Sequence, residues 1–439
     1  MAMVVKNNMS AKNTLNQLNR NEKAASKNLK KLASGMKING ADDDASGLSI
    51  SEKMDVRLRS LEQDNQNVQN GSSMLKVAEG AMASTVDILK TMKEKVINAA
   101  NDTNSDADRA IIQKEIDQAI DQIDDNANVS YNGKLMVDGS MNDLVKDPGT
   151  YTHLTNQSFA MGTTAYDMLT DLKTRTGDSL GILVGDTVTV SYVKDGETKI
   201  VSMEVAEDTA LASIFNREPC IYDLTLQDNP SDLSKIGTDQ FGNDVYTPDR
   251  SDAITYIAQQ EGIAGQISGL TICVSDKDGN LRKSANAVLD NFNETIRAQN
   301  PSPDNAVVLQ TGTKANEAIK IGFTDMRSVA LGLRTPAGKT LNVSTQANAN
   351  AAINVVDTAL QKVLDQQTKV GAVESRLDFT SSNIVVAAEN TQSSMSVIRD
   401  ADMASEMTAY TKNNVLLQAS QSMLAQANQS SSSVLSLLQ

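Results

Sequence analysis

Residues 32–47 read LASGMKINGADDDASG, and this stretch separates two helical patterns near the start of the chain. Before it, apolar and small residues recur at alternating steps of three and four from Leu15 to Met36; after it, the alternation resumes at Met54 and continues to Val96. That spacing is typical of helices that bury a narrow seam against other helices. The Gly- and Asp-rich segment 38–44 is typical of a turn. The sequence therefore predicts a helix, a turn and a second helix of about 65 Å, at about 1.5 Å per residue.

The last hundred residues mirror this beginning. A seam with the same register runs from Val356 to Ile398, and the segment 400–402 (DAD) is typical of a joint. A last helix then carries the stripe Met403, Met407, Tyr410, Leu417, Leu424, Leu435 and Leu438. Near the other end, a shorter helix follows the long one, and the segment 102–106 (DTNSD) supplies its capping residues. Its expected buried side consists of Ile112, Ile116, Ala119, Ile120 and Ile123.

Polar residues interrupt these seams at Asn65, Ser72, Gln367, Ser381, Asn414, Gln421 and Asn428. A polar residue in a helical seam lowers stability but can define register and partner choice. We therefore expect the two arms to pair within one molecule, and their outermost segments to become ordered only on association.

The middle of the chain, about 140–340, has a different character. All seven prolines lie between Pro148 and Pro336, and the first aromatic residue is Tyr131. Residues 186–205 alternate polar and apolar around KDGE (194–197), which indicates a hairpin, and 309–323 indicates a second one. Helical patterns are expected at 252–260 and 284–298. The predicted fold is mainly α, with long antiparallel coiled-coil helices from both termini and an α+β insert between them.

Composition argues against several classes of function. Net charge is −15, aromatic residues make up 3% and tryptophan is absent, so a nucleic-acid partner and an aromatic-lined enzyme pocket are both disfavoured. Residues 1–40 carry eight Lys/Arg against one acidic residue, Glu22. Such a basic helix could bind nucleic acid or a membrane surface, but it lacks interleaved aromatics; we prefer a solvated face or one that meets acidic neighbours in an assembly.

The N-terminus lacks the apolar run of a secretory signal, and no stretch of the sequence has the 18 or more apolar residues, roughly, that a membrane span needs. We expect a chain without membrane insertion that is cytoplasmic or is exported by a route that uses no such signal.

Candidate catalytic and metal-binding groups are few. His153 is the single histidine and lies in a loop-like stretch, so we expect a surface residue and no Ser–His or Cys–His pair. Residues 42–47 (DDDASG) fit the first half of a calcium-binding loop, but Lys53 stands where the closing glutamate is required, so an acidic helix cap is preferred. Cys220 and Cys273 are either buried thiols or a single bridge. We expect no enzyme, no cofactor and no metal.

Three segments together resemble the ends of bacterial flagellin, the subunit of the flagellar filament. Residues 32–47 resemble its "LSSGLRINSAKDDAAG", residues 398–406 (IRDADMASE) resemble "IEDADYATE", and residues 423–438 (MLAQANQSSSSVLSLL) are similar to "VLAQANQ…VLSLL". The three motifs occur in order at the correct ends, and the resemblance covers about 1–140 and 305–439.

The resemblance implies a structural subunit that polymerises into the helical filament used for swimming, outside the cell. It implies filament-core helices at 1–44 and 401–439, the two halves of a helical rod at 45–145 and 301–400, and a variable, surface-exposed insert at 146–300. Assembly would bury leucines of the terminal helices against neighbouring copies: Leu15, Leu18, Leu29, Leu32, Leu417, Leu424, Leu435 and Leu438.

The family also implies partners other than the chain itself. Flagellins are exported unfolded through the flagellum's own secretion apparatus, and they meet hook-associated junction and cap proteins in the filament. An export chaperone would hold the last 40 or so residues by the stripe Leu416, Leu417, Met423, Leu424, Val434, Leu435, Leu437 and Leu438.

Family members are also recognised by Toll-like receptor 5. The receptor-facing segment "LQRVRELAVQSAN" corresponds to residues 89–101, and the candidate face here is Lys93, Glu94 and, on the next helix, Glu115. The first arginine of the pattern is Thr91 in this chain, and the leucine after the glutamate is Lys95. Because both changes remove a plausible anchor, we expect weak recognition.

Three alternatives remain at this point. A junction or cap-type axial protein shares the terminal heptads, but the close motif matches favour the filament subunit. A cytoplasmic coiled-coil signalling protein would have seams adjacent in sequence around a central tip, whereas an insert of about 200 residues divides these. A hydrolase insert would need a metal or nucleophile constellation, which a single histidine makes improbable.

Overall fold

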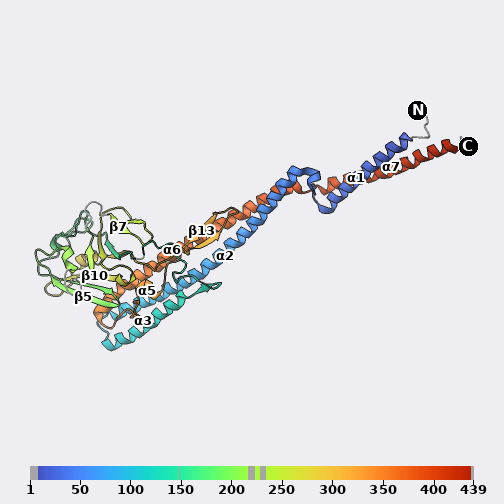
Figure 1. The fold of residues 1–439 in the computed structure, drawn as a ribbon. Helices are drawn as coiled ribbons and strands as arrows, with labels where there is room; N and C mark the ends of the chain where they lie inside the picture. Colours follow the sequence, from blue (N-terminus) through green and yellow to red (C-terminus); the bar gives the residue numbers. More distant parts are fainter. Residues whose placement is uncertain (1–7, 148, 216–222, 228–233, 437–439) are drawn as a thin grey trace. The chain divides into compact units, whose positions relative to one another are not determined.

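The structure is a computed structural model that describes residues 8–147, 149–215, 223–227 and 234–436, with side chains up to residue 430 in the last helix. Long helices form both ends of the chain and the middle is rich in β-structure (Figure 1). The chain divides into two compact units. Unit 1 contains residues 1–68, 311–317 and 379–439, and unit 2 contains residues 69–310 and 318–378.

Unit 1 is built from helices of both termini. The first and last helices, α1 (Met9–Ser34) and α7 (Met403–Ser436), lie side by side in Figure 1. The unit also contains the beginning of α2 (Ala41–Ala99) and the end of α6 (Gln346–Arg399). Asp44 has an extended backbone (φ −162°, ψ 105°), so the long continuous part of α2 begins after it. The predicted helix, turn and long helix are confirmed.

The seams predicted for the long helices are buried. On α2 the buried apolar positions recur every seven residues at Leu61, Val68, Leu75, Met82, Leu89 and Val96. On α6 they do so at Val356, Val363, Val370, Leu377 and Ile384. Seven residues are two helical turns, so each set forms one stripe. The predicted polar seam residues Asn65 and Ser381 are hydrogen-bonded to each other in unit 1, where the Ser381 hydroxyl donates at 2.8 Å.

The third helix, α3 (Asp106–Ala127), begins with a capping box. The Ser105 hydroxyl accepts from the Asp108 N–H, and the Asp108 carboxylate accepts from the Ser105 N–H at 3.0 Å. The isoleucines predicted to face inward, Ile112, Ile116, Ile120 and Ile123, are buried. The DTNSD segment therefore separates and caps the two helices.

Unit 2 contains two antiparallel sheets and smaller ribbons. A three-stranded sheet has the order β10 (Ile267–Ser275), β4 (Thr187–Lys194), β5 (Glu197–Glu204). A four-stranded sheet has the order β11 (Asn293–Ile296), β3 (His153–Asn156), β9 (Ile254–Ala258), β6 (Leu224–Leu226). The paired ribbons are β1 (Ser130–Tyr131) with β2 (Lys134–Leu135), β7 (Lys235–Thr238) with β8 (Asp244–Tyr246), and β12 (Val307–Gln310) with β13 (Ala318–Ile321).

Short helices complete this unit. They are α4 (Lys283–Leu289), α5 (Ser328–Leu331) and the 3-10 turns η1 (Leu169–Asp171), η2 (Leu211–Phe215) and η3 (Ile263–Gly265). The core beneath the sheets contains aromatic residues, which are scarce in the helical ends. The Phe215 and Tyr256 rings lie 4.6 Å apart and the Tyr256 and Phe292 rings lie 5.2 Å apart, centre to centre.

Both predicted hairpins are present. Thr187 pairs with Glu204 and Lys194 with Glu197, which leaves Asp195 and Gly196 as a two-residue loop. Both loop residues have positive φ, 52° and 68°, as a type I′ turn requires. The second hairpin is β12–β13, slightly earlier in sequence than the predicted 309–323.

The helix predicted at 252–260 is wrong. Residues 254–258 form β9, an interior strand of the four-stranded sheet. Ile254, Thr255, Tyr256 and Ala258 are all buried, so both faces of the strand are covered. A short apolar run that is buried on both sides lacks the alternation that distinguishes a strand from a helix. At 284–298 only the beginning is helical, because α4 ends at Leu289 and β11 follows.

His153 is also not a surface residue. It lies in β3, is buried, and its Nδ1 lies 3.0 Å from the Tyr151 carbonyl oxygen. Burial lowers the pKa of His153, which favours the neutral ring. Cys273 is a half-buried free thiol, whereas Cys220 lies outside the described residues.

Candidate functional site

Residues 35–37, just before the predicted turn 38–44, lie in unit 1 against residues 399–401, which overlap the predicted joint 400–402. Gly35 ends α1 with φ 70°, a left-handed conformation that glycine adopts without strain. The Lys37 N–H donates to the Arg399 carbonyl at 2.7 Å, and the Ala401 N–H donates to the Gly35 carbonyl at 2.9 Å. Backbone hydrogen bonds therefore connect the N- and C-terminal arms where each arm turns.

The carboxylates of the acidic turn have separate partners. Asp43 accepts from Lys27 Nζ at 2.8 Å and from the Asn39 N–H at 3.1 Å; the hydrogen bond with Lys27 is the main reason why the pKa of Asp43 is lowered. Asp44 accepts from the N–H groups of Ser46 and Gly47, each at 3.0 Å. These contacts make Asp44 the cap of the long helix, as the acidic-cap interpretation expected.

The contact between α1 and α7 combines apolar side chains with hydrogen-bonded polar ones. The Asn21 amide, which is buried, donates to the Ser420 hydroxyl at 2.9 Å and to the Leu416 carbonyl at 3.3 Å. The Asn28 amide donates to Glu406 Oε2 at 2.7 Å, and Asn413 donates to Asn28 Oδ1 at 3.1 Å. Lys31 forms an ion pair with Glu406 at 3.3 Å. Basic residues of the first helix thus pair with acidic groups, Asp43 and Glu406, of the same unit.

The register of this seam corrects the prediction. On α1 the shielded positions are Thr14, Leu18, Asn21, Ala25, Asn28 and Leu32, whereas the prediction had 15, 22 and 29 in place of 14, 21 and 28. On α7 they include Asn413, Asn414, Leu417, Ser420, Leu424 and Ala427, so the predictions of Gln421 and Asn428 were each one residue late, whereas Asn414 is half-buried as predicted. Seam positions recur at alternating steps of three and four residues, so a given set of apolar residues fits two registers that differ by one residue at every second position. On these helices the apolar residues alone indicated the wrong one of the two registers.

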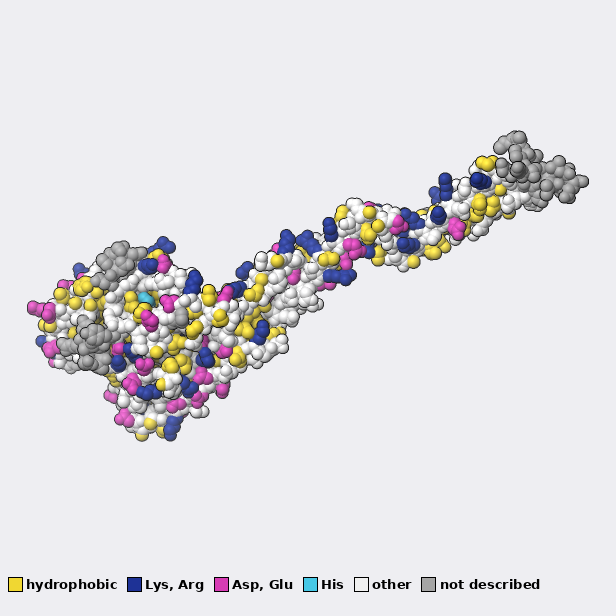
Figure 2. Space-filling view, viewed as in Figure 1, with side chains coloured by type: hydrophobic (Ala, Val, Ile, Leu, Met, Phe, Trp, Pro, Cys, Tyr) yellow, Lys and Arg dark blue, Asp and Glu magenta, His cyan; other side chains and the backbone are white. Residues whose placement is uncertain are grey.

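That correction separates the predicted assembly leucines into two sets. Leu18, Leu32, Leu417 and Leu424 are half-buried at the seam. Leu15 and Leu29 are 45% and 49% exposed, and on α7 Leu416 and Met423 are 40% and 61% exposed. Further exposed apolar side chains on these helices are Met9, Met403, Met407 and Val415, and Figure 2 shows such side chains open on the surface. The side chains of Val434 and Leu435, and residues Leu437 and Leu438, lie outside the described part.

Two family models match this chain. The bacterial flagellin N-terminal helical region matches residues 5–142, and the bacterial flagellin C-terminal helical region matches residues 353–438. A flagellin of Clostridium tyrobutyricum is 33% identical over 428 residues, which are 97% of this chain and 99% of that protein. The chain belongs to the bacterial flagellins.

Other similar proteins are polar flagellin A of Vibrio parahaemolyticus (32% identical over 444 residues, 100% of both chains) and flagellin of Bacillus subtilis (29% over 441 residues, 99% and 100%). Matching solved structures include flagellar hook associated protein-3 from Legionella pneumophila (15% identity, 79% of this chain and 98% of that chain, TM-score 0.36). FliC from Burkholderia pseudomallei also matches, with 16% identity over 70% of this chain and 99% of that chain and a TM-score of 0.26.

Membership of the family makes this flagellin a structural subunit of the extracellular filament that serves motility, and not an enzyme. The full-length relatives favour the filament subunit over a signalling coiled coil, and flagellins polymerise and associate with other flagellar proteins. Within the described residues, no helix combines the length and the apolar character that crossing a membrane requires.

The candidate receptor-facing residues lie in unit 2 of this flagellin. Lys93 forms an ion pair with Asp357 at 2.5 Å, and Glu115 forms one with Lys95 at 2.6 Å. Glu94 is exposed. Lys95 stands where the family pattern has an apolar residue, and its ammonium group pairs with Glu115, one of the two glutamates that match the pattern.

Proposed function

We propose that this flagellin polymerises through α1 and α7, which pair as an antiparallel coiled coil that neighbouring copies complete. The observation that carries the proposal is that polar side chains lie inside the contact of this helix pair while large apolar side chains lie exposed outside it. Asparagines, serine and a glutamate occupy much of the internal seam, whereas Leu15, Leu29, Leu416 and Met423 lie outside it. The hydrogen-bonded partners run in opposite order along the two helices, from Asn8 with Ala427 to Lys31 with Glu406.

The energetics support coupling between folding and assembly. A buried asparagine pair contributes little net free energy, since its hydrogen bonds replace hydrogen bonds to water. Burying the remaining half of an exposed leucine or methionine contributes roughly 1 kcal/mol, from about 1.5–3 kcal/mol for full burial. Several such side chains on each subunit offset the entropy of ordering helices that are weak alone.

Truncation tests this mechanism. Removing residues 1–35 or 405–439 leaves unit 2 with its own core, so we expect a folded, soluble monomer that does not polymerise. The measurement is electron microscopy after seeding, with circular dichroism as the check of folding. Filaments formed by either truncated chain would contradict the proposal.

Point variants separate the apolar contacts from the loss of a whole helix. Leu15→Gln combined with Leu29→Gln removes two exposed side chains of α1 without touching the hydrogen-bonded seam. We expect slower growth from seeds and a higher critical concentration. The matched control is Leu281→Gln, which changes a 59% exposed leucine in the insert and should leave growth unchanged.

We propose that the segments of the chain have separate roles in the filament, with the boundaries predicted from the sequence. Residues 1–44 and 401–439 supply the filament core, 45–145 and 301–400 supply the rod, and 146–300 form an outward-facing insert. The chain reaches the cell exterior through the flagellum's own secretion apparatus, and hook-associated junction and cap proteins meet the ends of the filament.

An export chaperone is proposed for the C-terminal stripe. Exposed Leu416 and Met423 support it, because apolar side chains that the subunit leaves open are available to a partner before assembly. Leu416→Gln combined with Met423→Gln should weaken capture of the full-length chain by such a chaperone in a pull-down. Unchanged capture would place the binding surface elsewhere.

Recognition by Toll-like receptor 5 is proposed to be weak. The ion pairs of Lys93 and Glu115 support this, since a receptor would have to compete with Asp357 and Lys95 for them. A reporter-cell assay with purified monomer should give a low response, and Lys95→Leu should increase it. Robust signalling by the unmodified chain would contradict the proposal.

A further inference from the structure

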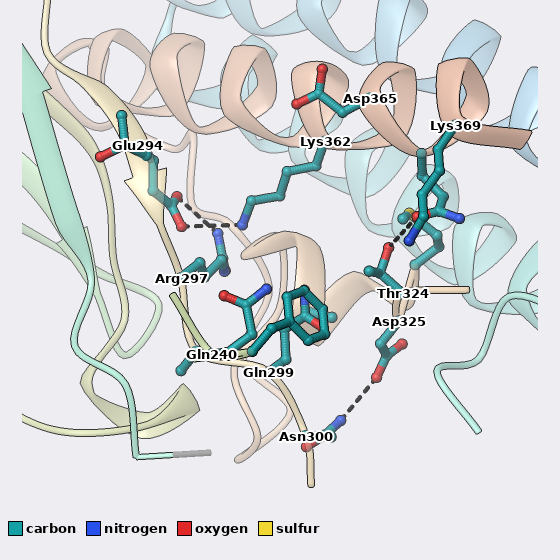
Figure 3. Close-up of a pocket in the computed structure, with 16 residues that line it drawn as sticks. Gln240, Glu294, Arg297, Gln299, Asn300, Thr324, Asp325, Lys362, Asp365 and Lys369 are labelled. Carbon is teal, nitrogen blue, oxygen red and sulfur yellow. Dashed lines mark hydrogen bonds and ion pairs between the residues drawn. The ribbon is translucent and has the colours of Figure 1, made fainter. Parts of the chain in front are cut away.

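A pocket of about 310 Å³ lies in unit 2 beside α6. It is formed by the end of β11 and the segment after it, by the loop between β7 and β8, by the segment after β13, and by α6 (Figure 3). Its volume is at the lower end of the range of small-molecule sites, roughly 300–1,000 Å³. Filament assembly as described above assigns no role to this pocket.

One wall of the pocket carries two cations on a single carboxylate. Glu294 Oε2 accepts from Arg297 Nη1 at 3.0 Å, and Glu294 Oε1 accepts from Lys362 Nζ at 3.1 Å. Figure 3 shows the Arg297 and Lys362 side chains meeting at this glutamate. The side chains of Glu294 and Arg297 are 1% and 7% exposed, while that of Lys362 is 24% exposed. When Lys362 is protonated, the group has one positive charge in excess.

Arg297 also has a donor that is not used. Its Nη2 donates to Gln266 Oε1 and its Nη1 reaches Ser268 Oγ at 3.5 Å, but its buried Nε has no hydrogen-bond partner among the described residues. A buried donor without an acceptor costs roughly 1–3 kcal/mol. The unsatisfied donor adds to the positive charge that Arg297 and Lys362 have in excess of Glu294, and such a group favours an oxyanion.

Neutral polar side chains form another part of the lining. Gln299 accepts from Asn142 at 2.8 Å, Asn300 donates to Asp325 at 2.9 Å, and Thr324 donates to Gln366 at 3.1 Å, so these groups are held in place. The Phe241 ring adds an apolar surface. Anchored amides and a hydroxyl, together with one ring, suit a ligand with several hydroxyl groups.

We propose that this pocket binds a small hydroxylated carboxylic acid of the size of a uronic acid, with its carboxylate at Arg297 and Lys362 and its hydroxyls at the amide-lined side. Burial and the neighbouring Arg297 charge lower the pKa of Lys362 to about 7, so the group formed by Glu294, Arg297 and Lys362 has its excess positive charge below neutral pH. The other charged groups that line the pocket are Asp325, which pairs with Arg327, and Asp365 and Lys369 of α6.

Calorimetric titration of the full-length chain at pH 6 with sodium glucuronate tests the proposal, with glucose as the neutral match. We expect binding of glucuronate and none of glucose. Lys362→Met should weaken glucuronate binding about 10-fold or more, the loss of one charge-assisted hydrogen bond. The control Lys76→Met removes an exposed lysine of α2 that pairs with Glu374 and does not line the pocket; it should leave binding unchanged.

A second measurement needs no variant. Partial acetylation followed by mass spectrometry reports how fast Lys362 reacts, and glucuronate should slow its modification while leaving Lys76 unaffected. Absence of binding, equal binding of glucose, or unprotected Lys362 would each overturn the proposal. None of these results bears on polymerisation.

Discussion

Asn21 occupies a buried position of the seam between α1 and α7, where a leucine would pack better. Removing one partner of a buried hydrogen bond destabilises a protein mainly when the other partner is left without a hydrogen bond. Ser420 keeps a partner after such a change, because its hydroxyl also lies 2.7 Å from the Leu416 carbonyl. We expect Asn21→Leu to stabilise the helix pair of the free subunit by about 1 kcal/mol.

Circular dichroism during thermal unfolding of the monomer measures this effect. Asn16→Leu is the matched control, since Asn16 lies on the same helix at an exposed position outside the seam. It should leave the helicity of the pair unchanged. A loss of helicity in Asn21→Leu would show instead that the polar contact stabilises the seam.

Lys362 predicts a pH dependence of stability. Its pKa is lowered to about 7 in the folded chain, chiefly by burial, from an ordinary value of 10.5. A lysine with a lowered folded-state pKa binds fewer protons when folded, so the free energy of unfolding rises with pH between the two values. Relative to that of Lys362→Met, the free energy of unfolding of the unmodified chain should rise by roughly 1 kcal/mol per pH unit between pH 7 and 9. Denaturant titrations of both chains measure the difference, and parallel pH profiles would contradict it.

At the level of elements, the hairpin β4–β5 depends on Gly196. Its φ of 68° is unfavourable for other residues, and a Cβ there would lie 2.8 Å from Thr335 Cγ2 and 3.2 Å from Lys339 Cβ. Gly279 has φ 84° but no atom within 4 Å of such a Cβ. We expect Gly279→Ala to cost about 1–2 kcal/mol from the backbone alone, and Gly196→Ala to cost more. Equal losses in denaturant unfolding would mean that the loop moves away from Thr335.

The elements differ in how far sequence predicts them, for physical reasons. Leu61 to Val96 and Val356 to Ile384 repeat every seven residues across several turns, so their helices and buried faces follow from spacing alone. KDGE at 194–197 identifies its hairpin because few residues accept a positive φ. The strand β9 is different: burial of both its faces comes from β3, β6 and the surrounding core, which no local pattern encodes.

The assembly surface was predicted only in part. Apolar spacing identified the terminal helices and their leucines, but it placed Leu15 and Leu29 inside the seam, where Thr14 and Asn28 lie instead. Which of two adjacent positions faces the partner helix depends on hydrogen bonds between residues about 400 apart in sequence, such as Asn21 with Ser420. The pocket at Arg297 combines four segments of the chain and had no signal in the sequence.

For the whole molecule, the two units should differ in stability before assembly. Unit 2 contains a large apolar core, whereas the contact between α1 and α7 includes several polar side chains and leaves leucines open. Local opening free energy follows buried apolar contact, so the terminal helices should open far more often in the free subunit. Hydrogen exchange followed by mass spectrometry should show fast exchange in α1 and α7 of the monomer and slow exchange at 352–363 of α6. In seeded filaments the terminal helices should become protected by at least 100-fold, about 2.7 kcal/mol, while 352–363 change little. Equal protection of α1, α7 and 352–363 in dilute monomer would mean that the terminal pair is complete without neighbours, and assembly would then need another source of free energy.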